Sequence, residues 1–178
     1  MAINYQFIAQ TTLASTVTTV TFSNIPQNFT DLYLVVNSYT TSLSGTQPFY
    51  LIFNSDTSST NYVGGYTLQS GTTKYATTIA GATVASSQVS GYSASTANGY
   101  PVYTSVYIGN YSGASLGYQT LWNSVTDAST TINQIAWGMM NYTSTASALT
   151  TLAVHSATTT SFAAGSTFSL YGILKAGV

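Results

Sequence analysis

The sequence predicts an all-β protein: a single antiparallel β-sandwich domain, jelly-roll-like, that spans residues 1–178. Charged residues make up 3% of the chain, yet 44% of its residues are hydrophobic and 13% are aromatic, so the chain can bury an apolar core. Glu and Arg, which helix surfaces favour, are absent, whereas the abundant Ser and Thr suit strands and turns. Hydrophobic residues also recur with the period of two that is typical of strands.

Alternation of side chains locates most of the strands. Segment 101–111 is the clearest case, because its aliphatic residues fall on one face and Tyr103, Tyr107 and Tyr111 fall on the other. We predict that these three tyrosines form an interaction surface, since large aromatic side chains bury much area at a modest entropy cost. Other alternating segments are 3–9, 15–22, 62–68, 118–126, 132–142 (with Ile135, Trp137 and Met139 on one face), 149–155 and 166–174.

Two further segments are continuous apolar runs without alternation. They are residues 32–36 and 49–53, and turn-forming residues bound each of them. Such runs are typical of strands that are covered on both faces. We therefore expect them in the middle of the sandwich or at a contact between subunits.

Residues 80–100 depart from the alternating pattern. Ala, Ser, Gly and Thr dominate this low-complexity stretch, which has few large apolar residues. A structureless loop of that length is uncommon inside a compact domain. Two interpretations stay open: an arm that a neighbouring subunit orders, or a poorly patterned pair of strands with a long loop.

The scarcity of charge and of metal ligands excludes several classes of function. A net charge of −1 with two lysines gives no basic patch for nucleic acid. The chain has no apolar run of the roughly 18 residues that a membrane helix needs, so no membrane partner is expected. With no Cys and one His, we also expect no metal site and no cofactor.

The candidate catalytic residues have simpler structural interpretations. Ser115 lies in a Gly-x-Ser-x-Gly match, but a strand follows it where a hydrolase elbow needs a helix. His155 is the single histidine and stands where a strand passes into a turn. Asp56 follows an apolar strand in a segment suited to a turn, although the same oxygen atoms could bind Ca²⁺. We predict that the protein has no catalytic residue and is not an enzyme.

Four motifs follow one another along the chain and carry a resemblance. They are FSNIPQNFTDL at 22–32, LIFNSD at 51–56, IGNY at 108–111 and SLYGI at 169–173. In this order they resemble small virion structural proteins of tailed phages, including phages of cyanobacteria, of the capsid decoration (cement) or tail-fibre type. The resemblance spans residues 15–174. It implies a jelly-roll-like sandwich, commonly trimeric, with no enzymatic residues.

The resemblance includes both capsid and tail proteins, so the location on the particle is inferred from other features of the sequence. We expect a capsid decoration subunit on the capsid exterior, a homotrimer bound to the major capsid protein, because the chain lacks the elongated repeats of a fibre shaft. The alternative is a tail-fibre or tail-tip module that binds a receptor or glycan on the host surface. Fifteen Tyr and two Trp could supply the aromatic surfaces on which sugars stack.

Overall fold

The protein is an antiparallel β-sandwich, which confirms the predicted fold class. The structure, a computed structural model, describes residues 4–41, 49–70, 72–80, 87–88, 101–113, 117–127, 133–144, 148–156 and 160–174. Its strands are β1 (Asn4–Thr12), β2 (Thr19–Phe22), β3 (Asp31–Ser38), β4 (Phe49–Phe53), β5 (Tyr62–Ser70), β6 (Thr73–Ala80), β7 (Ser87–Gln88), β8 (Val102–Gly109), β9 (Tyr118–Asp127), β10 (Asn133–Tyr142), β11 (Leu152–Ser156) and β12 (Thr167–Leu174). A short 3-10 turn, Ser59–Asn61, precedes β5.

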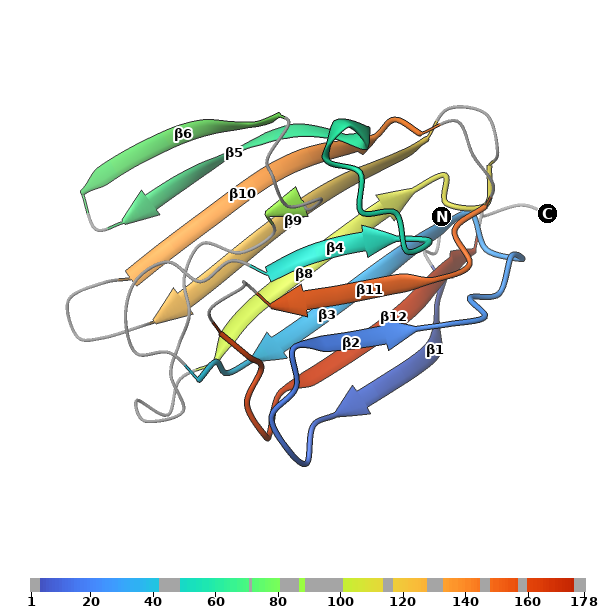
Figure 1. The fold of residues 1–178 in the computed structure, drawn as a ribbon, viewed down its shortest axis with the longest axis horizontal. Coiled ribbons are helices and arrows are strands. Elements are labelled where there is room, and N and C mark those ends of the chain that lie inside the picture. Colours follow the sequence, from blue (N-terminus) through green and yellow to red (C-terminus); the bar gives the residue numbers. More distant parts are fainter. Residues whose placement is uncertain are drawn as a thin grey trace.

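The strands form a large sheet and a small sheet in jelly-roll order (Figure 1). The large sheet runs β1-β12-β3-β8-β9-β10-β5-β6, and the small sheet runs β2-β11-β4-β7. Within them, β1-β12-β3-β8 and β2-β11-β4-β7 are the two four-stranded halves of a jelly roll. Along the chain, β1, β3, β8 and β12 belong to the first half and β2, β4, β7 and β11 to the second, so the chain crosses between the halves at every step except from β4 to β7.

Two inserted hairpins widen one half of the jelly roll. The β5–β6 hairpin comes between β4 and β7, and the β9–β10 hairpin comes between β8 and β11. Both join the large sheet beyond β8, in the order β9-β10-β5-β6. We call these four strands the extension. In Figure 1, β2, β11 and β4 lie over β12, β3 and β8, whereas β10, β5 and β6 reach beyond the small sheet.

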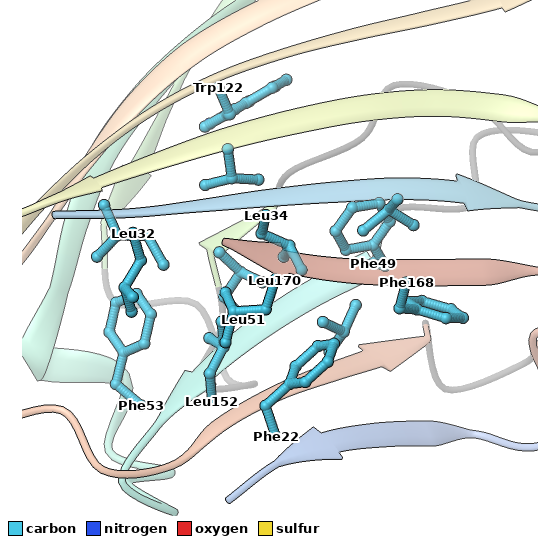
Figure 2. Packing of buried hydrophobic residues seen from close by; sticks show 14 of the residues in the cluster. Phe22, Leu32, Leu34, Phe49, Leu51, Phe53, Trp122, Leu152, Phe168 and Leu170 are labelled. Atoms are coloured by element: carbon cyan, nitrogen blue, oxygen red, sulfur yellow. The ribbon is translucent and has the colours of Figure 1, made fainter. Parts of the chain in front are cut away.

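The core lies between the two sheets. Leu34 and Leu170 of the large sheet and Leu51 and Leu152 of the small sheet have no solvent-exposed surface. Figure 2 shows these side chains gathered in the space between the sheets. Burying such a side chain contributes roughly 1.5–3 kcal/mol, so this layer is the main source of stability. At one end the core is aromatic, with Phe53 in contact with Tyr62, Tyr118 and Tyr142.

The two continuous apolar runs form β3 and β4, but neither is covered on both faces in the described part of the chain. In β3, Leu32 and Val36 are buried, while Tyr33 and Val35 are only partly buried. The burial of β4 alternates in the same way. The prediction of two covered faces is therefore wrong within the single chain, because the described residues of each sheet pack against one other layer only. Cover from another subunit stays a prediction.

Residues 80–100, singled out in the sequence, lie mostly outside the described residues. Ala80 ends β6, and 87–88 form β7, which pairs with β4. The sequence pattern missed β6, whereas a poorly patterned strand within 80–100, such as β7, belongs to one of the two interpretations left open. The remainder of the segment is not described, so the arm and the long loop both stay predictions.

Three of the sequence motifs meet at one end of the sandwich. Tyr111 is fully buried, and its hydroxyl donates a hydrogen bond to the backbone carbonyl of Pro26. The ring of Phe29 lies against the backbone of Gly172 in β12, where a Cβ atom would meet the ring at 2.3 Å. The loop between β2 and β3 is thereby fixed both to the turn that follows β8 and to β12.

The motif at 51–56 forms a tight turn that ends β4. Asn54 and Ser55 have φ of 49° and 60°, and the backbone N–H of Asp56 donates to the carbonyl of Phe53 at 2.8 Å. This is the geometry of a type I′ turn. The Asp56 carboxylate accepts bonds from the Ser58 N–H at 2.8 Å and from the side chains of Asn61 and Tyr142, both at 2.6 Å. The predicted turn role of Asp56 is confirmed.

Replacing Gly172 by Ala should destabilise the fold, because the added methyl group would occupy space taken by the Phe29 ring. We expect Gly172→Ala to lower the free energy of unfolding by about 1–3 kcal/mol, the usual cost of overpacking a core. Urea unfolding measures it. Gly109→Ala is the matched control, since its nearest contact is the Tyr107 ring edge at 3.3 Å. Equal losses in both variants would contradict the proposed packing.

The Asp56 carboxylate should make stability depend on acid pH. Burial acts to raise the pKa of Asp56, but hydrogen bonds from Tyr142, Ser58 and Asn61 outweigh it and hold the pKa below its usual value. A lowered pKa stabilises the fold above pH ~4, and this contribution is lost as the pH falls further.

We therefore expect Asp56→Asn to lower the free energy of unfolding by about 1–2 kcal/mol at neutral pH, in the lower part of the range for bonds to charged groups because the site is partly exposed. The variant should lose less stability than the wild type when unfolding is measured from pH 7 down to pH 2. Tyr142→Phe, which removes one of the bonds, should have a smaller effect. Parallel pH profiles for wild type and Asp56→Asn would refute this role.

Candidate interaction face

The large sheet exposes an apolar face on the side away from the small sheet, which we call the outer face. The even-numbered residues Leu34 of β3 and Val106 of β8 are buried. From β3 through β8, β9 and β10 to β5, the strand register pairs odd-numbered residues with odd-numbered ones. Odd-numbered side chains of these strands therefore point outward. The exposed apolar residues of the outer face are Tyr5, Phe7, Val63, Tyr103, Tyr107, Leu121, Val125, Ile135, Trp137 and Met139.

Register places large side chains of the outer face directly opposite one another. Met139 pairs with Leu121, Leu121 with Tyr107, and Tyr107 with Tyr33. Tyr33 pairs with Tyr171, whose partner on β1 is Phe7. Directly opposed side chains in antiparallel strands lie about 4.5–5.5 Å apart at Cβ, so the row forms a continuous apolar ridge across six strands.

The jelly-roll half of the outer face is a band of aromatic residues held by mutual contacts. The rings of Tyr5 and Tyr33 lie 5.5 Å apart, and those of Phe7 and Tyr171 lie 5.9 Å apart. Burial and a side-chain hydrogen bond with Tyr33 raise the pKa of Tyr103. Tyr5, Phe7, Tyr33, Tyr103, Tyr107 and Tyr171 make up this aromatic band.

The structure separates the three tyrosines that the sequence placed on one face. Tyr103 and Tyr107 lie on the outer face and are 45% and 36% exposed. Tyr111 is not exposed, so its assignment to this surface is wrong. β8 ends at Gly109, and Asn110 has a φ of 57°, which breaks the alternation before Tyr111. The role of Tyr103 and Tyr107 in a subunit contact stays a prediction.

Two hollows flank Trp137 on the extension. The first, of about 390 Å³, lies between Trp137 and the tyrosines Tyr33 and Tyr107, with Ser105, Leu121 and Asn123 also lining it. The second, of about 450 Å³, lies on the other side of Trp137. Its further lining residues include Gly65, Tyr66, Thr67, Ala76, Leu121 and Met139.

The hollows exist because short side chains stand between large ones. Ser105 and Asn123 are cross-strand partners in the first hollow, and the Ser105 hydroxyl donates to Asn123 Oδ1 at 2.6 Å. Thr67 and Ala76 are cross-strand partners in the second. Sequence reasoning missed this site: alternation put Trp137 on one face of its strand but gave no sign that this face points to solvent.

The residues weighed as catalysts do not form a site in the described part of the chain. His155 lies on β11, where its Nδ1 is 2.7 Å from the Thr19 hydroxyl and 3.1 Å from the Thr18 carbonyl. Ser115 lies outside the described residues. Among the residues that the structure does describe, no three His, Asp or Glu side chains gather as a metal site would require.

Tyr107 should ionise only at strongly alkaline pH. Burial, a hydrogen bond with Asp31 and the negative charge of that carboxylate raise the pKa of Tyr107 to about 12. A raised pKa stabilises the fold below pH ~10, and this contribution is lost as the pH rises through 12. In a spectrophotometric titration of phenolate, Tyr107→Phe should lose one tyrosine from the step near pH 12 and none from the step near pH 10. An unchanged high-pH step would contradict this assignment.

The chain matches no known family model, no curated protein and no solved structure. Within the described ranges, no helix is long and apolar enough to cross a membrane. A function for the protein is therefore inferred from the residues and the geometry of its outer face.

Proposed function

We propose that the protein is a non-enzymatic structural subunit of a tailed-phage particle, and that it assembles through the aromatic band on the outer face of its large sheet. The observation that carries the proposal is the exposed aromatic band, which includes Tyr5, Phe7 and Tyr103 at 54%, 57% and 45% exposure. Contiguous exposed apolar surface on a soluble protein is typical of an interaction site.

The scarcity of charge supports binding through apolar and hydrogen-bonding contacts. The whole chain has five charged residues, two basic and three acidic, which cannot build a network of ion pairs. An exposed ion pair contributes only about 0–1 kcal/mol, whereas apolar burial contributes roughly 25 cal/mol for each Å² removed from water. Tyrosine hydroxyls around the band can add hydrogen bonds to a partner's backbone.

The phage assignment rests on the ordered motifs and on what they do in the fold. Motifs 22–32, 108–111 and 169–173 meet where Phe29 and Tyr111 tie the loops to the sheets. They therefore belong to one jelly-roll framework, an architecture used by viral capsid proteins among others. We place the subunit on the capsid exterior as a homotrimer bound to the major capsid protein. A tail fibre or tail tip is the second candidate, and the hollows beside Trp137 favour it.

Truncating the aromatic band should weaken self-association more than removing a charge. We expect Tyr103→Ala to cost about 1 kcal/mol or more of association free energy, as an aromatic contact residue typically does. Lys74→Ala, on exposed β6, should change association by less than about 0.5 kcal/mol. Analytical ultracentrifugation of the isolated protein over a range of concentrations measures both.

Salt and localisation provide the remaining controls. Association should persist from low salt to about 1 M, where the Debye length falls to about 3 Å and charge contacts are screened. Fractionated particles should carry the protein on heads in many copies, whereas a tail component would appear on tails in few. A monomer at every concentration would refute assembly through this face, and a location off the particle would refute the phage assignment.

A further inference from the structure

We propose that Trp137 and the two hollows beside it form a binding site for a neutral oligosaccharide. The site lies on the outer face, over the extension and the neighbouring strands β8 and β3, and it shares only Tyr33 and Tyr107 with the aromatic band. Of the two tryptophans in the chain, Trp122 is buried and Trp137 is 46% exposed. Trp137 lines both hollows, so its indole borders each of them.

The strand register places a hydrogen-bonding side chain on each side of the indole. Trp137 pairs with Asn123 on β9 and with Thr67 on β5. Neighbouring strands lie about 4.8 Å apart, so the backbones of both residues lie one strand spacing from that of Trp137. Asn123 lines the first hollow and Thr67 lines the second. A pyranose ring stacked on Trp137 would therefore have an amide or a hydroxyl at its edge.

The polar floor of the first hollow is already ordered. Ser105 is 6% exposed, and its bond to Asn123 Oδ1 fixes the amide so that its NH₂ group can donate to a ligand. Preorganised polar groups lose little entropy on binding. A purely apolar ligand would leave these groups without partners, which costs free energy.

The lining of the hollows selects a neutral ligand. None of the described residues that line them is charged, so an anionic or cationic ligand would find no opposite charge. Volumes of about 390 and 450 Å³ lie in the range of small-molecule sites. Two hollows that share Trp137 and Leu121 as a common wall suit two adjoining sugar units better than one isolated sugar.

Titration of the full chain with neutral oligosaccharides tests the site. The probes are trimers and tetramers of glucose, of galactose and of N-acetylglucosamine, with oligogalacturonate as an anionic comparison. Trp137 lines both hollows and the mostly buried Trp122 lines the first, so a bound sugar should change the tryptophan fluorescence. Saturation-transfer NMR of the sugar protons gives a second readout that does not need the tryptophan.

Matched variants locate the binding. Trp137→Ala should weaken binding of the neutral oligomer at least about tenfold, Asn123→Ala should weaken it severalfold, and Trp137→Phe should retain part of it. Ile135→Ala is the control, because Ile135 is the next outward residue on the same strand, is 49% exposed and lines neither hollow. It should bind like the wild type. Circular dichroism checks that each variant is folded.

The sugar site does not depend on the assembly proposal, and different results would overturn the two proposals. Binding of none of the neutral oligomers, preference for the anionic one, or equal loss in Trp137→Ala and Ile135→Ala would each overturn the sugar site. If Trp137→Ala instead dissociates an oligomer and no sugar binds, the extension is a protein contact and the sugar site is overturned. Tyr103→Ala, which leaves both hollows intact, should reduce assembly and keep sugar binding.

Discussion

The packing of the small sheet on the large one is the constraint from which the rest of the molecule follows. Leu51 and Leu152 meet Leu34 and Leu170 across this interface, and all four are fully buried. Because side chains alternate along a strand, burying one face of the large sheet leaves the opposite face toward solvent. The large side chains on that outer face add little to the core, which is why we assign them to recognition.

Side-chain hydrogen bonds hold the loops in place, a role that ion pairs can fill in more highly charged proteins. Asn54 illustrates this: its Oδ1 accepts bonds from the backbone N–H groups of Thr150 and Thr151, and its Nδ2 donates to the carbonyl of Ala148. The turn after β4 is thereby tied to the segment that leads into β11. Tyr111 plays the same part at the loop before β3. Such bonds are directional, so each fixes a loop in one place.

The sequence was sufficient for the fold class and for most strands, but not for which face points inward. Period-two alternation in 132–142 put Ile135, Trp137 and Met139 together, yet the core side of β10 holds Ala136 and Met140. Large apolar residues stand on the outward face, so hydrophobicity alone gives the wrong orientation. Alternation also carried Tyr111 onto the tyrosine face, because the left-handed Asn110 that ends the pattern is not visible in residue types. The hollows depend on cross-strand neighbours far apart in sequence, which no local pattern reveals.

The two edges of the large sheet carry features that oppose pairing with an added strand. At one edge, the register of β1 shifts between Phe7 and Ala9, and such a bulge interrupts the ladder that an added strand would extend. At the other, β6 carries the exposed Lys74, a charge that opposes edge-to-edge pairing. Since the extension pairs with the β8 edge of the jelly roll, its hairpins move the edge of the large sheet to β6 and enlarge the outer face. The same two hairpins thus provide both the enlarged outer face and an edge strand that carries a charge.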